Sequence, residues 1–143
     1  NAGIRVGTII SSKQNIKRIR KNEPMWKLSS FDMNYLIEAI EDKKFKKKSL
    51  EKNEENKILL YKLLKKQLFI KKVYRSDSNF FLIKLKKIDS KRVQEALLKY
   101  KILIRNCANF DFLDKFHVRI AVKSKNSIKT LKKAFKEIEK NVY

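Results

Sequence analysis

Hydrophobic residues alternate with other residues along a short segment near the C-terminal end of the chain. In residues 116–122 every second position is apolar, and the positions between hold His117, Arg119 and Ala121. Successive side chains of a strand point to opposite faces, so the apolar set is expected to face a core and Arg119 the other side. Residues 101–106 form another short apolar run, which ends in Arg105 just before a polar loop. The pattern predicts two strands joined by that loop, each carrying one arginine.

The rest of the C-terminal region changes between strand and helix patterns. Residues 79–85 predict a strand, and apolar residues recur at helical spacing after Asp89 or Ser90 and again after Ser124 or Asn126. The order strand, helix, strand, strand, helix predicts an α+β fold, a small antiparallel-type sheet with helices on one face. Residues 50–69 precede this unit and predict a long connecting helix, with glutamates early and lysines late.

The N-terminal region has a different pattern. The segment from Ile4 to Ile10, flanked and interrupted by glycines, predicts a buried strand, and residues 33–40 carry an apolar stripe with helical spacing. We expect residues 1–44 to be the remnant of a larger α/β domain and residues 45–143 to be a C-terminal small domain. Because the strand would lack its neighbours, Ile4 to Ile10 is expected to be disordered, to pair with another copy, or to dock elsewhere.

The charge of the chain allows a second interpretation. Its 143 residues include 37 Lys and Arg against 15 Asp and Glu, a net charge of +22, and basic surfaces bind nucleic-acid phosphates. Most of these residues are lysines, however, and lysine runs are usually solvated faces. The sequence also lacks a Gly-x-x-Gly loop and an RNP-like glycine-aromatic string. A basic nucleic-acid-binding α+β module remains the alternative, and nucleic acid is not the expected partner.

Cysteine, histidine and hydropathy exclude several other classes. Cys107 is the only cysteine and His117 the only histidine, so the sequence predicts no internal disulfide and no zinc or other metal site. We interpret Cys107 as a small buried filler and His117 as a structural strand residue. No apolar run is long enough to span a membrane and no signal segment is visible, so a cytoplasmic location is expected.

The two arginines are the main candidates for chemistry. If Arg105 and Arg119 come from neighbouring strands, their guanidinium groups can converge on one carboxylate or phosphate dianion. The structural alternative is that each is solvated or paired with a nearby acid. A free-standing anion-sensing domain is a further possibility.

Four motifs, in order, resemble one family. "NAGIRVG", "SDSNFFLIKL", "ILIRNCANF" and "HVRIAV" are similar to the C-terminal part of class I/II aminotransferases of pyridoxal-phosphate fold type I. Among these, the histidinol-phosphate aminotransferases and threonine-phosphate decarboxylases are the most similar subgroups. The resemblance spans nearly the whole chain. It implies a homodimeric parent enzyme that uses pyridoxal 5'-phosphate on a small anionic substrate, an amino acid or phosphorylated amino compound.

The resemblance also implies roles for individual residues. Arg5 matches the arginine that holds the cofactor phosphate, and Arg119 matches the arginine that takes the substrate carboxylate. In relatives that act on phosphorylated substrates, Arg105 faces the same anionic end. Asn79 matches a motif asparagine at the substrate site, with a role in ordering the loop before its strand. Many relatives have a glycine after the second arginine strand, where this chain has Lys123 and Ser124.

One family residue is expected outside these 143 positions. The lysine that forms the Schiff base with the cofactor lies just upstream of the position of Arg5, hence before Asn1, and Lys13 and Lys17 fall on the wrong side of Arg5. No catalytic residue is therefore assigned. We expect the chain by itself to bind the cofactor weakly and to perform no turnover.

Overall fold

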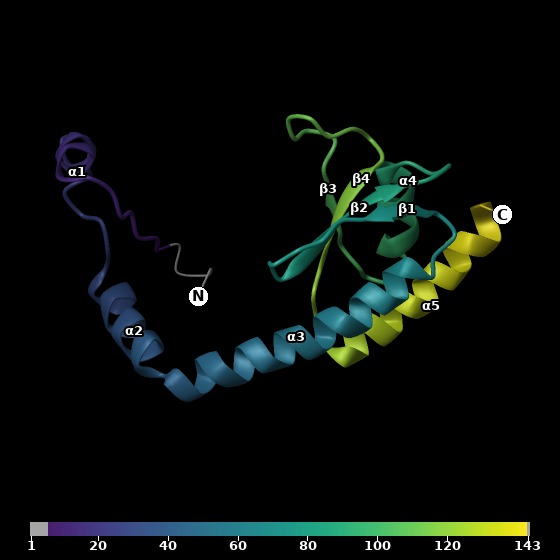
Figure 1. The fold of residues 1–143 in the computed structure, drawn as a ribbon, viewed down its shortest axis with the longest axis horizontal. Coiled ribbons are helices and arrows are strands. Elements are labelled where there is room, and N and C mark those ends of the chain that lie inside the picture. The colour runs from purple at the N-terminus through teal and green to yellow at the C-terminus, as the bar shows by residue number, and fades with distance from the viewer. Residues whose placement is uncertain (1–5, 143) are drawn as a thin grey trace. The chain divides into compact units, whose positions relative to one another are not determined.

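The computed structural model describes residues 6–142, with side chains up to residue 140. The chain divides into two compact units, one up to Lys48 and the other from Ser49 onward. Each unit is described by itself, and Figure 1 gives the course of the chain through both.

The first unit contains two short helices. Helix α1 (Lys13–Arg20) begins after Ser12, whose hydroxyl accepts from the N–H of Asn15, and α2 (Ser30–Glu41) begins with a capping box between Ser29 and Asp32. The expected strand from Ile4 to Ile10 is wrong in its described part, because residues 6–12 adopt no regular structure. A strand needs a ladder partner, and the described residues provide none for this segment.

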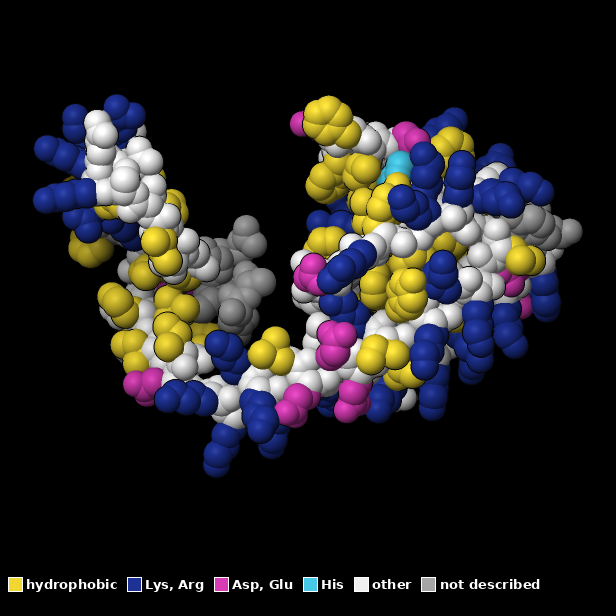
Figure 2. Space-filling model, viewed as in Figure 1, with side chains coloured by type: hydrophobic (Ala, Val, Ile, Leu, Met, Phe, Trp, Pro, Cys, Tyr) yellow, Lys and Arg dark blue, Asp and Glu magenta, His cyan; other side chains and the backbone are white. Residues whose placement is uncertain are grey.

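Helix α2 confirms the predicted helical spacing, but its apolar stripe is not buried. Neither α1 nor α2 buries a residue. Large hydrophobic side chains are instead exposed along this unit (Figure 2), namely Ile9, Ile10, Ile19, Met25, Trp26, Leu28, Phe31, Met33, Tyr35, Ile37, Ile40 and Phe45. Apolar surface of this extent is typical of a region that contacts another surface.

Helix α3 (Lys43–Lys65) is longer at its start than the sequence predicted. The Asp42 carboxylate accepts from the N–H of Phe45 at 2.8 Å, so the basic stretch forms the first turns of the helix. Its buried residues, Asn56, Leu60, Leu63 and Leu64, all lie in the C-terminal half. The helix ends at Lys65 rather than at the predicted Phe69. Residues 70–73 then form a strand that the sequence analysis did not predict.

Four strands form one antiparallel sheet. They are β1 (Ile70–Val73), β2 (Phe80–Leu85), β3 (Arg105–Asn106) and β4 (His117–Ala121), in the order β1-β2-β4-β3. β4 lies between β2 and β3, so the two arginine-bearing strands are neighbours, as expected. Only the last part of the predicted strand over residues 101–106 pairs. Its first residues leave α4 through a tight turn in which Lys101 has a φ of 57°.

Helices α4 (Ser90–Leu98) and α5 (Lys125–Val142) complete the second unit. Side chains from α3, α4 and α5 share one core with alternate residues of β2 and β4, among them Leu60, Leu97, Ile83, Val118, Ile120 and Phe135. α5 runs parallel to the C-terminal half of α3 (Figure 1), since Lys125 at its start pairs with Glu55 at 3.2 Å and, near its end, the Glu139 carboxylate accepts from the N–H of Leu68 at 2.8 Å. The predicted α+β class is confirmed. No described helix has the length and apolar character needed to cross a bilayer.

A matched pair of phenylalanines tests where the core lies. Phe135 is 0% exposed and meets Phe69 edge to face at 5.2 Å, whereas Phe112 is 104% exposed. We expect Phe135→Ala to lower the free energy of unfolding by about 3–5 kcal/mol, because it leaves a cavity. Phe112→Ala should change it by less than about 0.5 kcal/mol. Urea unfolding measures both, and equal losses would contradict the described core.

Candidate anion-binding site

The sheet has a second face that carries no helix of this unit. On β2 the residues alternate between half-buried and buried, with Phe81, Ile83 and Leu85 in the core. The opposite face holds the remaining side chains of the strands, namely Lys72, Phe80, Leu82, Lys84, Arg105, His117, Arg119 and Ala121. We call this the open face. It contains both candidate arginines.

Arg105 and Arg119 are direct partners across the β3–β4 ladder. Residues that face each other in an antiparallel pair project from the same side, with Cβ atoms about 4.5–5.5 Å apart. Two like charges in this position repel each other, so the pairing destabilises the sheet unless a negative group lies between or above them. The structure therefore brings together the two arginines on which the sequence interpretation depended.

Neither arginine is neutralised by an acid within the described residues. The Arg119 guanidinium carbon lies 4.0 Å from the centroid of the Phe80 ring, and that of Arg105 lies 5.2 Å from the Phe110 ring. Arg105 Nη2 also donates to the neutral Asn109 Oδ1 at 3.3 Å. No carboxylate of the described chain is within ion-pair distance of either arginine.

The Nε atom of Arg119 is buried and has no hydrogen-bond partner. A buried donor without an acceptor costs about 1–3 kcal/mol, so native structures almost always satisfy such groups. Together with the paired charges, this orphaned donor indicates that the arrangement needs an acceptor, which the described residues do not supply.

Cationic side chains continue along the open face toward β1. Lys72 and Lys84 are partners across the β1–β2 ladder, and the Lys72 ammonium lies 4.6 Å from the centroid of the Tyr74 ring. Lys84 is 3.7 Å from a carboxylate oxygen of Asp114. The open face is thus basic across all its strands, and an anionic molecule is the ligand that its charge favours.

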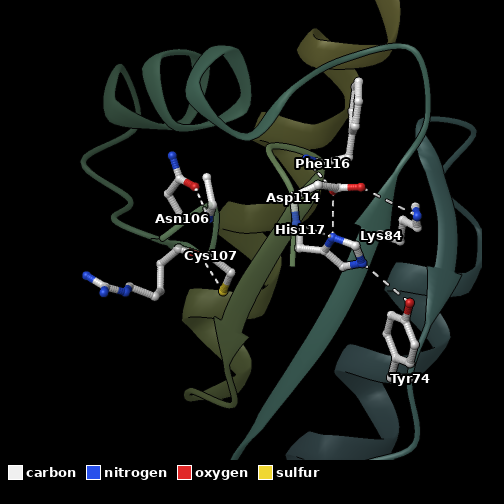
Figure 3. Close-up of polar contacts among 9 residues, drawn as sticks. Tyr74, Lys84, Asn106, Cys107, Asp114, Phe116 and His117 are labelled. Carbon is white, nitrogen blue, oxygen red and sulfur yellow. Dashed lines mark hydrogen bonds and ion pairs between the residues drawn. The ribbon is translucent and has the colours of Figure 1, made fainter. Parts of the chain in front are cut away.

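Asp114 and His117 anchor the loop between the two arginine strands (Figure 3). His117 Nδ1 lies 2.7 Å from Asp114 Oδ1 and 3.3 Å from the backbone nitrogen of Asp114. The Tyr74 hydroxyl lies 3.4 Å from Nε2 of the same ring. His117 is buried and satisfied, and these contacts give it a structural place in the sheet.

Asp114 is exposed, yet its charged form is favoured. The N–H of Phe116 donates to Asp114 Oδ1 at 2.9 Å, and this bond, followed by the one from His117, holds the pKa of Asp114 below its ordinary value of 3.8. The carboxylate therefore stays ionised at neutral pH and ties the end of the loop to β4.

Cys107 is fully buried next to the arginine pair. Its N–H donates to the carbonyl of His117 at 3.0 Å, and its thiol lies 3.6 Å from the carbonyl of Arg105. Burial raises the pKa of the thiol above its usual 9.0, and the nearby charges of Arg119 and Arg105 offset this only in part. The thiol remains protonated at neutral pH.

The remaining predicted positions lie elsewhere. Asn79 immediately precedes β2, and its carbonyl accepts from the N–H of Val122 at 2.8 Å, which places it one position from Phe80 at the end of the sheet. Its side chain is exposed. Arg5 lies outside the described residues. Lys13 and Lys17 are exposed on α1.

Sequence analysis missed the groups that hold the arginines in place. The sequence analysis singled out none of Phe80, Phe110 and Asp114. A signal was present for Phe80, because the alternation in residues 79–85 puts it opposite Phe81 and Ile83. The loop residues Phe110 and Asp114 carried no such signal, since a loop has no fixed side-chain period.

Comparison with known families identifies the family of the chain. The family model "Aminotransferase class I and II" matches residues 1–138. The chain belongs to this family. The resemblance recognised in the four motifs is confirmed, and the alternative of a nucleic-acid-binding module is not favoured.

Two curated relatives are similar to this chain over nearly its whole length. Histidinol-phosphate aminotransferase of Methanocaldococcus jannaschii is 31% identical over 137 residues, which cover 96% of this chain and 36% of that protein. The adenosylcobalamin biosynthesis bifunctional protein CobDQ of Leptospira interrogans is 34% identical over 143 residues, which cover 95% of this chain and 16% of that protein. The chain thus spans well under half the length of either relative.

Solved structures of the family agree with the fold. The histidinol-phosphate aminotransferase of Clostridium acetobutylicum matches with a TM-score of 0.85 and 29% identity, covering 90% of this chain and 39% of that one. L-threonine-O-3-phosphate decarboxylase of Porphyromonas gingivalis matches with a TM-score of 0.82 and 23% identity, covering 96% of this chain and 42% of that one, which shows the shared fold alone. Family membership implies pyridoxal phosphate as the cofactor of full-length relatives.

The lowered pKa of Asp114 makes a testable contribution to stability. A carboxyl whose pKa is lower in the folded chain stabilises the fold above its unfolded pKa, and this contribution disappears as the pH falls through the folded value. We expect Asp114→Asn to lower the unfolding temperature at pH 7, with the difference from wild type vanishing below pH 3.8. Thermal unfolding followed by circular dichroism from neutral to acidic pH measures this. Asp111→Asn in the same loop is the control, and a difference independent of pH would contradict the assignment.

Proposed function

We propose that this chain provides the substrate-anion-binding part of a pyridoxal-phosphate-dependent enzyme of the class I and II aminotransferase family. The observation that carries the proposal is the cross-strand pairing of Arg105 with Arg119 on the open face, with no acid of the described chain neutralising either. Paired guanidinium groups bind planar or tetrahedral oxyanions through parallel, charge-assisted hydrogen bonds. The orphaned Nε of Arg119 supports the same reading, since it lacks only an acceptor.

The proposed substrate is an amino acid or amino compound whose anionic end carries more than one negative charge. Two arginines on one site exceed what a single carboxylate requires, whereas a phosphate monoester is a dianion with three oxygens available. The names of the relatives include histidinol phosphate and L-threonine O-3-phosphate, both phosphorylated amino compounds. A phosphorylated substrate is therefore the more specific form of the proposal, with transamination and decarboxylation as the two candidate reactions.

The roles of the individual residues follow from their positions. Arg119, central in the sheet, would hold the anion from β4, and Arg105, on the edge strand, would close on it from the side. Asn79 would act indirectly. At the start of β2, its backbone carbonyl accepts from the N–H of Val122, and this bond holds the neighbouring Phe80 in position. Arg5 stays the candidate for the cofactor phosphate.

The described residues do not by themselves form a cofactor site. A Cβ added at Gly7 would meet no atom within 4 Å, so no described residue packs closely against this glycine, which follows Arg5 by two positions. When bound in a full-length relative, pyridoxal phosphate supplies the electron sink for the reaction. The contribution assigned to the described residues is to bind and orient the substrate anion. The exposed apolar side chains of the first unit would contact the remainder of the enzyme or a second copy, in keeping with a homodimeric parent.

Anion binding by the arginine pair is directly measurable. We expect O-phosphothreonine to bind the chain, and Arg119→Gln or Arg105→Gln to weaken binding by about tenfold or more, because each removes charge-assisted hydrogen bonds. Isothermal titration calorimetry at low ionic strength gives the dissociation constants.

Arg92→Gln is the matched control for these two variants. It removes the same charge from an exposed position on α4, so it should change the affinity by less than about twofold through long-range screening alone. Equal weakening by Arg92→Gln and Arg119→Gln would show diffuse charge attraction and contradict the proposed site.

Because the Schiff-base lysine is expected upstream of Asn1, we predict that this chain alone forms no specific adduct with pyridoxal phosphate. Incubation with pyridoxal phosphate followed by borohydride should give no stoichiometric adduct at any one lysine, because the exposed lysines of α1 have no site around them. Peptide mass spectrometry of the reduced sample measures occupancy at each lysine. A single lysine labelled to completion would contradict the assignment.

A further inference from the structure

Both candidate arginines are held by aromatic rings. Arg119 lies over the ring of Phe80, which is its diagonal neighbour on β2, at 4.0 Å from the ring centroid. Arg105 lies over the ring of Phe110, in the loop that leads to β4, at 5.2 Å. The two rings come from different elements, so the two contacts are independent of each other.

An aromatic ring and a carboxylate can both orient a guanidinium group, but they differ in how much of its positive charge they leave for a ligand. A carboxylate fixes the group but cancels its charge, and an incoming anion must then displace it. The face of an aromatic ring attracts the cation through its quadrupole, by about 0.5–2 kcal/mol depending on exposure, and leaves the net charge intact. A ring packed on one face of a guanidinium group does not itself use the N–H donors, which lie in the plane of the group.

Two acids lie in the same loop as Phe110, and neither pairs with an arginine of the site. Asp114, in the same loop as Phe110, bonds to His117 and lies 3.7 Å from Lys84. Asp111 is adjacent to Phe110 in sequence and pairs with neither arginine. The loop thus places an aromatic ring, rather than one of its carboxylates, against Arg105.

We propose that Phe80 and Phe110 are positioning residues of the anion site, which hold Arg119 and Arg105 in orientation without neutralising their charge. The inference rests on the proposed function and adds a requirement to it. The supports of the two arginines must be uncharged, and a charged support would orient the groups equally well but abolish binding. The same requirement explains why, within the described residues, the Arg105 guanidinium donates to the neutral amide of Asn109 and to no carboxylate.

A substitution series at Phe110 tests this requirement. Phe110 is partly exposed in a loop, so the fold should tolerate change there. For inorganic phosphate and O-phosphothreonine, measured by calorimetry, we expect Phe110→Tyr to bind like wild type and Phe110→Leu about two- to fivefold more weakly, from the lost ring contact. Phe110→Glu should bind more than about tenfold more weakly, because its carboxylate occupies Arg105. Phe80→Tyr and Phe80→Leu should reproduce the first two steps at Arg119.

Phe112→Glu is the control for the added charge. Phe112 is in the same loop and exposed, and it makes no ring contact with either arginine. This variant carries the same net charge as Phe110→Glu and should weaken binding by less than about threefold at moderate salt. Circular dichroism and thermal unfolding of each variant confirm that the fold is retained.

The outcomes separate this inference from the function on which it rests. If wild type binds phosphate through Arg119 but the Leu and Glu variants at Phe110 bind equally well, the rings have no positioning role and only this inference fails. It also fails if Phe112→Glu weakens binding as much as Phe110→Glu. If wild type binds neither anion, the proposed function itself is wrong.

Discussion

The antiparallel pairing of β4 with both of its neighbours determines the rest of the second unit. β4 pairs with β2 on one edge and with β3 on the other, so its alternation decides which residues of all three strands share a face of the sheet. Val118 and Ile120 project into the core beneath α3, α4 and α5, and this burial fixes the register, because a shift by one residue would place Arg119 in the core. The hydrophobic effect on one face thereby positions the charges on the other.

The open face combines three features that are unfavourable in a stable sheet. Like charges face each other across two ladders, a buried guanidinium nitrogen has no acceptor among the described residues, and Asp114 bonds to the loop and to Lys84 rather than to an arginine. Strain and unsatisfied groups of this kind concentrate at functional sites, where a ligand completes the interactions. On the proposed function, the ligand that completes the interactions of this face is the anionic end of the substrate.

The first unit shows the opposite situation. Its helices form where the sequence places caps, as at Ser29, but no core closes over their apolar residues. Local signals suffice for a helix because its hydrogen bonds are internal, whereas a strand depends on a partner from elsewhere. This is why the stripe over residues 33–40 was correctly assigned to a helix and the segment from Ile4 to Ile10 was not found as a strand in its described part.

The sequence by itself determined the α+β class, the faces of β2 and β4, and the presence of an arginine on each of two strands, because these follow from side-chain periodicity. It did not determine β1, which follows α3 after a short turn over residues 66–69, or the early start of α3. Only the tertiary structure decided that Arg105 and Arg119 are direct partners across the ladder. The same holds for the ring contacts of Phe80 and Phe110 with these arginines and for the hydrogen bond between Asp114 and His117. The physical reason is that these contacts depend on register and loop path, and both are fixed by the burial of residues distant in sequence.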